Sequence, residues 1–180
     1  MKSFTKWFSG PVAIVLLAST VAASDALIAG KIQSVNADKK EFVLTDTLGK
    51  DHTFELGKTV VINRDGKESS NDLKANEKVS LSYDKGTLSW TAHYILVHEG
   101  DAKNYELRIG SFKNYDPDQK TFTVTDTEGK DGTYAMNGTK VSLNTQPSKI
   151  QDIKIGDTIL FIVEVKGDKT TLKDMMVSRK

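Results

Sequence analysis

The sequence predicts an all-β protein, with two small five-stranded barrels in tandem behind a cleaved leader. The first observation is an internal repeat, because residues 42–54 return at 122–134 with eight of thirteen positions identical. The second is the alternation of apolar and polar residues in short segments, which is typical of half-buried strands. The third is the regular spacing of turn residues between these segments, with no long helical pattern.

Residues 1–23 have the pattern of a secretory signal peptide. Lys2 and Lys6 precede an apolar run over 11–23, and small residues follow near residue 24, where cleavage is expected. The apolar run is shorter than the roughly 20 residues that cross a bilayer, so we expect no membrane span after cleavage. The sequence therefore predicts an exported protein, periplasmic or extracellular.

The first barrel is expected over residues 24–100. Its strands are predicted at 31–35, 41–46, 54–56, 78–83 and 91–98, with 59–63 as an extension of the third strand or a short extra one. Gly49 lies in the hairpin turn between the second and third strands, where a positive φ is needed. Residues 70–75 are expected to form one helical turn, with Leu73 against the barrel end.

Residues 101–105 are predicted to be a polar linker, and residues 106–180 a second copy of the barrel. The two copies align without a gap, so that Phe42 corresponds to Phe122 and each later position of the first copy has its counterpart at the same offset. The order of three strands, a helical turn and two strands is that of an OB-like barrel, and an SH3-like barrel is the alternative. Closure of either barrel hides the strand edges that would otherwise pair between chains.

Composition excludes several classes of function. The chain has 25 basic and 24 acidic residues, and its formal charge of +1 becomes −1 when Lys2 and Lys6 are removed with the leader. Basic and acidic residues alternate, so no basic patch for nucleic acid is predicted. There is no cysteine, and no motif for a catalytic nucleophile or a phosphate-binding loop. The sequence predicts a non-enzymatic protein without a cofactor.

Metal binding is the alternative function, and its candidate ligands are His52, His93 and His98. His93 and His98 are an odd number of residues apart in one strand, so we expect them on opposite faces. The Met, His and Trp residues that exported copper-binding OB-fold chaperones use together form no local cluster in this sequence. The carboxylates of 46–51 and 126–131 lack the spacing of a calcium loop and are typical of hairpin turns.

Trp90 and Tyr94 are candidates for an interaction surface. Their even spacing places them on one face of the last strand of the first barrel. They are expected to close the barrel end or to pack between the barrels, and the alternative is that they stack on a glycan, a peptide or a base.

The strand predicted at 159–165 is apolar on both faces, unlike its counterpart in the first repeat. Leu160 and Ile162 replace Ser80 and Ser82, which are expected to face water. A strand with two apolar faces is normally covered on both. We therefore expect Leu160 and Ile162 to pack outside their own barrel, on the first barrel or a partner chain, or else to form an open binding patch.

The chain resembles exported bacterial OB-fold-like proteins of unknown function. The resemblance is carried by the first strand and its glycine (30–35), the strand and turn over 42–50, and the Asp-Leu-Lys segment before a strand (72–79), and it recurs in the second repeat. It implies a small barrel and an envelope location, but it transfers no functional residue. Together with the composition, it predicts a binding module whose partner is a protein or an envelope polymer.

Overall fold

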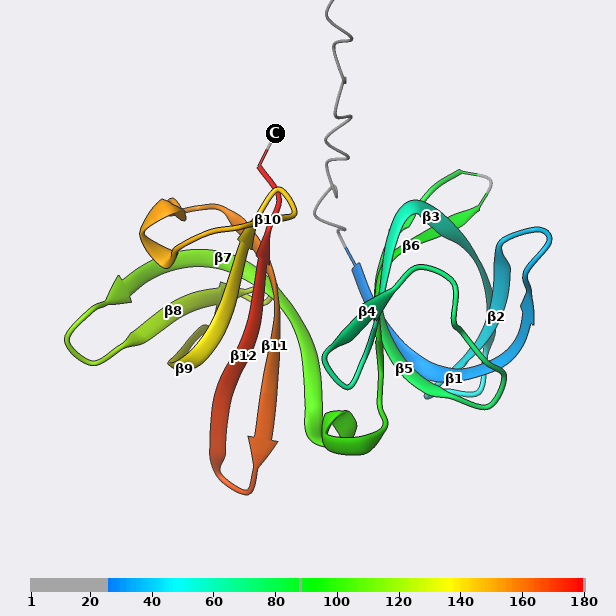
Figure 1. The fold of residues 1–180 in the computed structure, drawn as a ribbon, viewed down its shortest axis with the longest axis horizontal. Helices are drawn as coiled ribbons and strands as arrows, with labels where there is room; N and C mark the ends of the chain where they lie inside the picture. Colours follow the sequence, from blue (N-terminus) through cyan, green and yellow to red (C-terminus); the bar gives the residue numbers. More distant parts are fainter. Residues whose placement is uncertain (1–25, 88, 180) are drawn as a thin grey trace, which may run out of the picture.

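The structure, a computed structural model, describes residues 26–87 and 89–179 as a series of strands with two short 3-10 helices (Figure 1). The first unit contains β1 (Ala26–Asn36), β2 (Glu41–Asp46), β3 (Asp51–Arg64), β4 (Lys67–Ser69), β5 (Lys78–Lys85) and β6 (Trp90–Val97). After η1 (Gly100–Asn104), the second unit contains β7 (Tyr105–Asp116), β8 (Thr121–Asp126), β9 (Asp131–Leu143), β10 (Gln146–Pro147), η2 (Ile150–Asp152), β11 (Thr158–Lys166) and β12 (Lys169–Val177).

Each unit closes into a five-stranded barrel. In the first, the hydrogen-bonded order is β2-β1-β5-β6-β3, and β2 also pairs with β3. The second has the corresponding order, β8-β7-β11-β12-β9, closed by β9 and β8. One neighbouring pair in each barrel is parallel, β3 with β6 and β9 with β12. This is the strand order of the OB fold. The prediction of two tandem OB-like barrels is confirmed, and the SH3-like alternative is not the one observed.

The repeated hairpin turn is built around one carboxylate. Asp46 Oδ1 accepts the backbone N–H groups of Leu48 and Lys50, each at 2.9 Å, and Gly49 takes a φ of 82°. Asp126 makes the same two bonds in the second barrel, at 2.9 and 2.8 Å. These carboxylates therefore shape the turns, as the sequence predicted.

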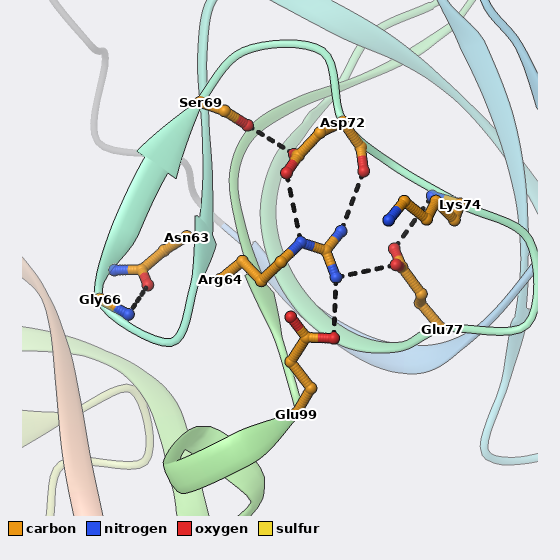
Figure 2. Close-up of polar contacts among 8 residues, drawn as sticks. All are labelled: Asn63, Arg64, Gly66, Ser69, Asp72, Lys74, Glu77 and Glu99. Atoms are coloured by element: carbon orange, nitrogen blue, oxygen red, sulfur yellow. Dashed lines mark hydrogen bonds and ion pairs between the residues drawn. The ribbon is translucent and has the colours of Figure 1, made fainter.

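The segment over 70–75 differs from its prediction because it forms no helical turn. Asp72 is held by Arg64, whose Nε lies 3.2 Å from the carboxylate and whose second terminal nitrogen donates to the Asp72 carbonyl at 2.9 Å (Figure 2). Leu73 still packs into the core, at 8% exposure. In the second barrel the corresponding segment contains η2.

Each barrel has its own apolar core, in which aromatic rings pack against one another. Phe42 and Phe54 stack with their centroids 5.3 Å apart, and Phe122 and Tyr134 occupy the corresponding place in the second barrel at the same distance. The barrels lie side by side and are joined through η1 (Figure 1). The predicted leader lies outside the described residues. Within 26–87 and 89–179, no helix is long and apolar enough to cross a membrane.

Candidate functional site: the cleft between the barrels

A buried apolar cluster lies between the two barrels and belongs to neither core. Its buried members are Tyr94, Leu96, Ala102, Leu107, Leu160 and Ile162. Leu27, Val61, Tyr105, Ile109 and Met176 pack against it. Counterparts in the repeat meet here, since Leu27 and Leu107 both take part, as do Leu96 and Met176. The same face of each barrel therefore contributes to the contact.

The outward side chains of β11 are covered by this contact. Leu160 is 8% exposed and Ile162 is 2% exposed, while Phe161 and Val163 point into the core of the second barrel. The two-sided apolar pattern predicts a cover outside their own barrel, and the structure places Tyr94 and Leu96 of the first barrel there. Ser82, expected to face water, is only 1% exposed and lines the cleft between the barrels.

A cleft of about 680 Å³ opens beside the cluster. Its lining includes Val61, Ser82 and Tyr94 from the first barrel and Leu160, Asp174 and Met176 from the second. Binding sites for small molecules are commonly clefts of roughly 300–1,000 Å³, mostly apolar with a few convergent polar groups, and they often lie between domains. The cleft has this character, so it is the candidate functional site.

Tyr94 carries the polar group at the centre of the first barrel's wall. Its hydroxyl accepts a hydrogen bond of 2.8 Å from Asn63 Nδ2, and both residues are buried. Burial raises the pKa of the Tyr94 hydroxyl well above its usual range, and the bond from Asn63 opposes this only in part. The hydroxyl therefore remains protonated and has its own hydrogen to donate.

Asp174 carries the polar group of the facing wall, and it is the repeat counterpart of Tyr94. It lies on β12 between Ile162 of β11 and Lys140 of β9. Burial raises the pKa of the Asp174 carboxyl to about 6, the negative charge of Glu68 adds to the effect, and Lys140 opposes it. Two carboxylates, one from each barrel, thus share the cleft.

Trp90 and Tyr94 do not share a face, which corrects the expectation from their spacing. β5 pairs Ser82 with Tyr94 and Tyr83 with Ala92, so His93 is an extra residue in β6. Such a bulge reverses the alternation of side chains. Trp90 consequently packs against the first core, and Tyr94 points out of the barrel toward the cleft.

The ring of Trp90 is already in contact with other side chains of the first barrel. His52 stacks on it with a centroid distance of 4.9 Å, and Tyr83 stacks on it at 5.1 Å. The Lys85 ammonium lies 4.9 Å from the ring centroid. Trp90 therefore packs within its own barrel and not between the barrels.

The three histidines have three different partners. His52 Nε2 lies 2.8 Å from Asp46 Oδ2, His93 Nε2 lies 2.8 Å from Asp84 Oδ2, and His98 Nε2 lies 2.8 Å from Ser80 Oγ. Burial lowers the pKa of His98. Within the described ranges, no group of three or more His, Cys, Asp or Glu side chains is arranged to hold a metal ion. Of the three, His93 lines the cleft.

Sequence reasoning missed the polar residues of the cleft. Asp174, Glu68 and Ser82 come from three separate strands and share no local motif. One signal was present, because Asp174 stands at the repeat position of Tyr94, where an acid replaces an aromatic residue.

Comparison with known proteins finds similarity only among solved structures. No family model matches the chain, and no curated protein matches it. The Ag(I) form of CusF is 22% identical over 41% of this chain and 97% of its own, with a TM-score of 0.33. The Cu(II) form of a tryptophan variant of CusF from Escherichia coli is 20% identical over 45% of this chain and 100% of its own, with a TM-score of 0.34. Apo-CusF from Escherichia coli is 22% identical over 42% of this chain and 88% of its own, with a TM-score of 0.33.

Proposed function

We propose that this chain is an exported, non-enzymatic binding module and that its ligand site is the cleft between the barrels. The observation that carries the proposal is the cleft itself, about 680 Å³ in volume and lined from both barrels. A ligand seated there would contact the walls contributed by Tyr94 and by Asp174 together. Export is supported by the signal-peptide pattern of residues 1–23.

The non-enzymatic part of the proposal is supported by the kind of residues that line the cleft. Its walls are mainly apolar side chains, hydroxyls and carboxylates. The histidine among them, His93, is engaged by Asp84 at 2.8 Å. Apolar walls with a few polar groups fix the orientation of a ligand. The sequence contains no motif for a catalytic nucleophile.

A fragment screen by two-dimensional amide NMR tests the proposal. Small apolar and amphipathic fragments are expected to shift the amide signals of the residues around the cleft. Lys140→Trp places a bulky ring in the lining and is expected to abolish these shifts. Lys58→Trp, at an exposed position of β3 outside the lining, is the matched control and is expected to retain them. Fragments that bind elsewhere, or equally well to both variants, would contradict the proposal.

The same spectra test the metal-binding alternative. Ag(I) and Zn(II) are added to the protein and to a variant in which His52, His93 and His98 are all alanine. Signal changes at the histidines of the unmodified protein, absent from the variant, would favour metal binding over the cleft.

A further inference from the structure

The carboxylate of Asp174 has no cationic partner in the part of the chain that the structure describes. None of the ion pairs found there includes Asp174 or Glu68. Lys140 is the neighbouring residue on β9, but its side chain is exposed and not within ion-pair distance. A half-buried carboxylate without a cation is costly in a folded protein.

Ser82 is a second unsatisfied group in the same wall. It is 1% exposed and lines the cleft, and its side chain makes no hydrogen bond to any described residue. Buried hydroxyls normally have a hydrogen-bond partner, so the lack of one for Ser82 indicates that a ligand supplies the partner. The Tyr94 hydroxyl on the same wall already accepts a hydrogen bond of 2.8 Å from Asn63 Nδ2.

The remaining lining favours a ligand with an apolar body. Val61, Leu160 and Met176 contribute apolar surface between these polar groups. Lys140 also lines the cleft, but its side chain is exposed, whereas Asp174 is half-buried, so an anionic ligand in the cleft would meet the carboxylates of Asp174 and Glu68. A neutral apolar ligand would leave Ser82 without a hydrogen-bond partner and the Asp174 carboxylate without a cation.

We propose that the cleft binds a small organic cation, in which an ammonium group on an apolar body pairs with Asp174 and Glu68 and donates to Ser82. This inference rests on the proposed function, because it names the ligand class of the same cleft. The ammonium hydrogens would supply the missing donors, while the apolar body would pack against Leu160 and Met176.

Three probes of similar size and different charge test the ligand class on the full chain, purified after expression with its own N-terminal segment. They are benzylammonium, benzyl alcohol and benzoate, each titrated by NMR. Benzylammonium is expected to shift signals around the cleft and to bind at least about tenfold more tightly than benzyl alcohol. Benzoate is expected to give no shift there.

Asp174→Asn is expected to weaken benzylammonium by at least about tenfold and to leave benzyl alcohol unchanged. Asp168→Asn, an exposed acid in the hairpin between β11 and β12, is the matched control and should change neither. Binding of benzylammonium should strengthen from about pH 5 to about pH 7 as Asp174 ionises, and Asp174→Asn should remove that dependence.

The outcomes separate this inference from the proposed function. Equal binding of benzylammonium and benzyl alcohol in the cleft would overturn the cationic class and leave the cleft as a binding site. The cationic class would also be overturned if benzylammonium gave no shift while other fragments still bound in the cleft and Lys140→Trp still blocked them. The cleft would again remain a binding site. No shift by any probe or fragment would overturn both.

Discussion

Two arginines hold corresponding loops in the two barrels from positions that do not correspond. Arg64 donates to the Asp72 carbonyl at 2.9 Å and pairs with Glu77 at 2.8 Å and Glu99 at 3.0 Å (Figure 2). Its counterpart in the second repeat is Asn144. The guanidinium is therefore missing from that place in the second barrel.

In the second barrel the guanidinium comes from Arg179, the counterpart of Glu99. It donates to the Asp152 carbonyl at 3.0 Å and pairs with the Asp157 carboxylate. Asp152 and Asp157 are the repeat counterparts of Asp72 and Glu77. Asn144 accepts the Arg179 backbone N–H at 2.7 Å. Two substitutions that look unrelated in the alignment thus compensate for one another in space.

Arg64→Met should destabilise the first barrel, because it leaves the largely covered Glu77 without its cation. We expect a loss of about 1–3 kcal/mol in the free energy of unfolding, measured by chemical denaturation. Lys67→Met, at an exposed site on β4, is the control and should change the free energy by less than about 0.5 kcal/mol. Equal effects of the two substitutions would show that the network around Arg64 adds nothing to stability.

Arg179 should make stability depend on pH in the acid range. Its hydrogen bond holds the pKa of Asp157 below the usual value. A carboxyl with a lowered folded-state pKa contributes stability above its unfolded pKa of about 3.9, and this is lost as pH falls through the folded value. Thermal unfolding of Arg179→Gln is therefore expected to show a weaker fall in melting temperature below about pH 4 than the unmodified protein. Parallel pH profiles for the two proteins would contradict this role.

At the scale of elements, one extra residue in the last strand of each barrel creates the contact face. β6 has its bulge at His93, and β12 has one at Lys173, the repeat counterpart of His93. In both strands the side chains that follow the bulge change faces relative to simple alternation. Tyr94 and Asp174 consequently point out of their barrels, and each becomes part of a cleft wall.

β11 contributes two buried side chains, Leu160 and Ile162, to the contact between the barrels. The double substitution Leu160→Ser and Ile162→Ser restores the serines of the first repeat and removes two buried apolar side chains. Since burial of each contributes roughly 1.5–3 kcal/mol, we expect a loss of about 3–6 kcal/mol in the free energy of unfolding. Ile155→Ser, at a site 79% exposed, is the control and should have little effect. A double variant as stable as the control, with unchanged docking and oligomeric state, would contradict an interface on this face.

At the scale of the whole molecule, the two barrels meet through similar faces, as the subunits of a two-fold dimer do. Leu27 and Leu96 of the first barrel meet Leu107 and Met176, their repeat counterparts in the second. The pairing is not symmetric in chemistry, because the serines of β5 correspond to the apolar side chains of β11. The asymmetry leaves Ser82 buried and makes the cleft polar at its centre.

Two separately produced barrels should each expose the apolar face that they share in the full chain, and these faces should bind one another. A fragment of residues 26–99 and a fragment of residues 105–180 are expected to form a one-to-one complex when mixed, because burial of the apolar face favours docking. Analytical ultracentrifugation of the mixture would measure this. The Leu160→Ser, Ile162→Ser variant of the second fragment is the control and should not associate. Two monomeric, non-interacting fragments would show that the chain connection alone holds the barrels together.

The sequence by itself determined the barrels. The ungapped repeat, the turn signature around Asp46 and Gly49 and the alternation in the strands are all visible in the chain. Such local features specify the hairpins between consecutive strands. The two-sided apolar pattern at Leu160 and Ile162 also indicated that something covers β11. The export prediction still rests on residues 1–23 alone.

Only the tertiary structure decided the cleft. The bulge at His93 reversed the expected direction of Tyr94, and Ser82, which a strand pattern places in water, is buried in the structure. Asp174 and Glu68 come from different barrels and lie near one another only in the folded protein. In the second barrel, Arg179 likewise takes the role that Arg64 has in the first, although the two arginines are not at corresponding positions of the repeat. The physical reason is that periodicity specifies which way a side chain points within one regular strand. It carries no information about an inserted residue or about the surface that a second barrel will cover.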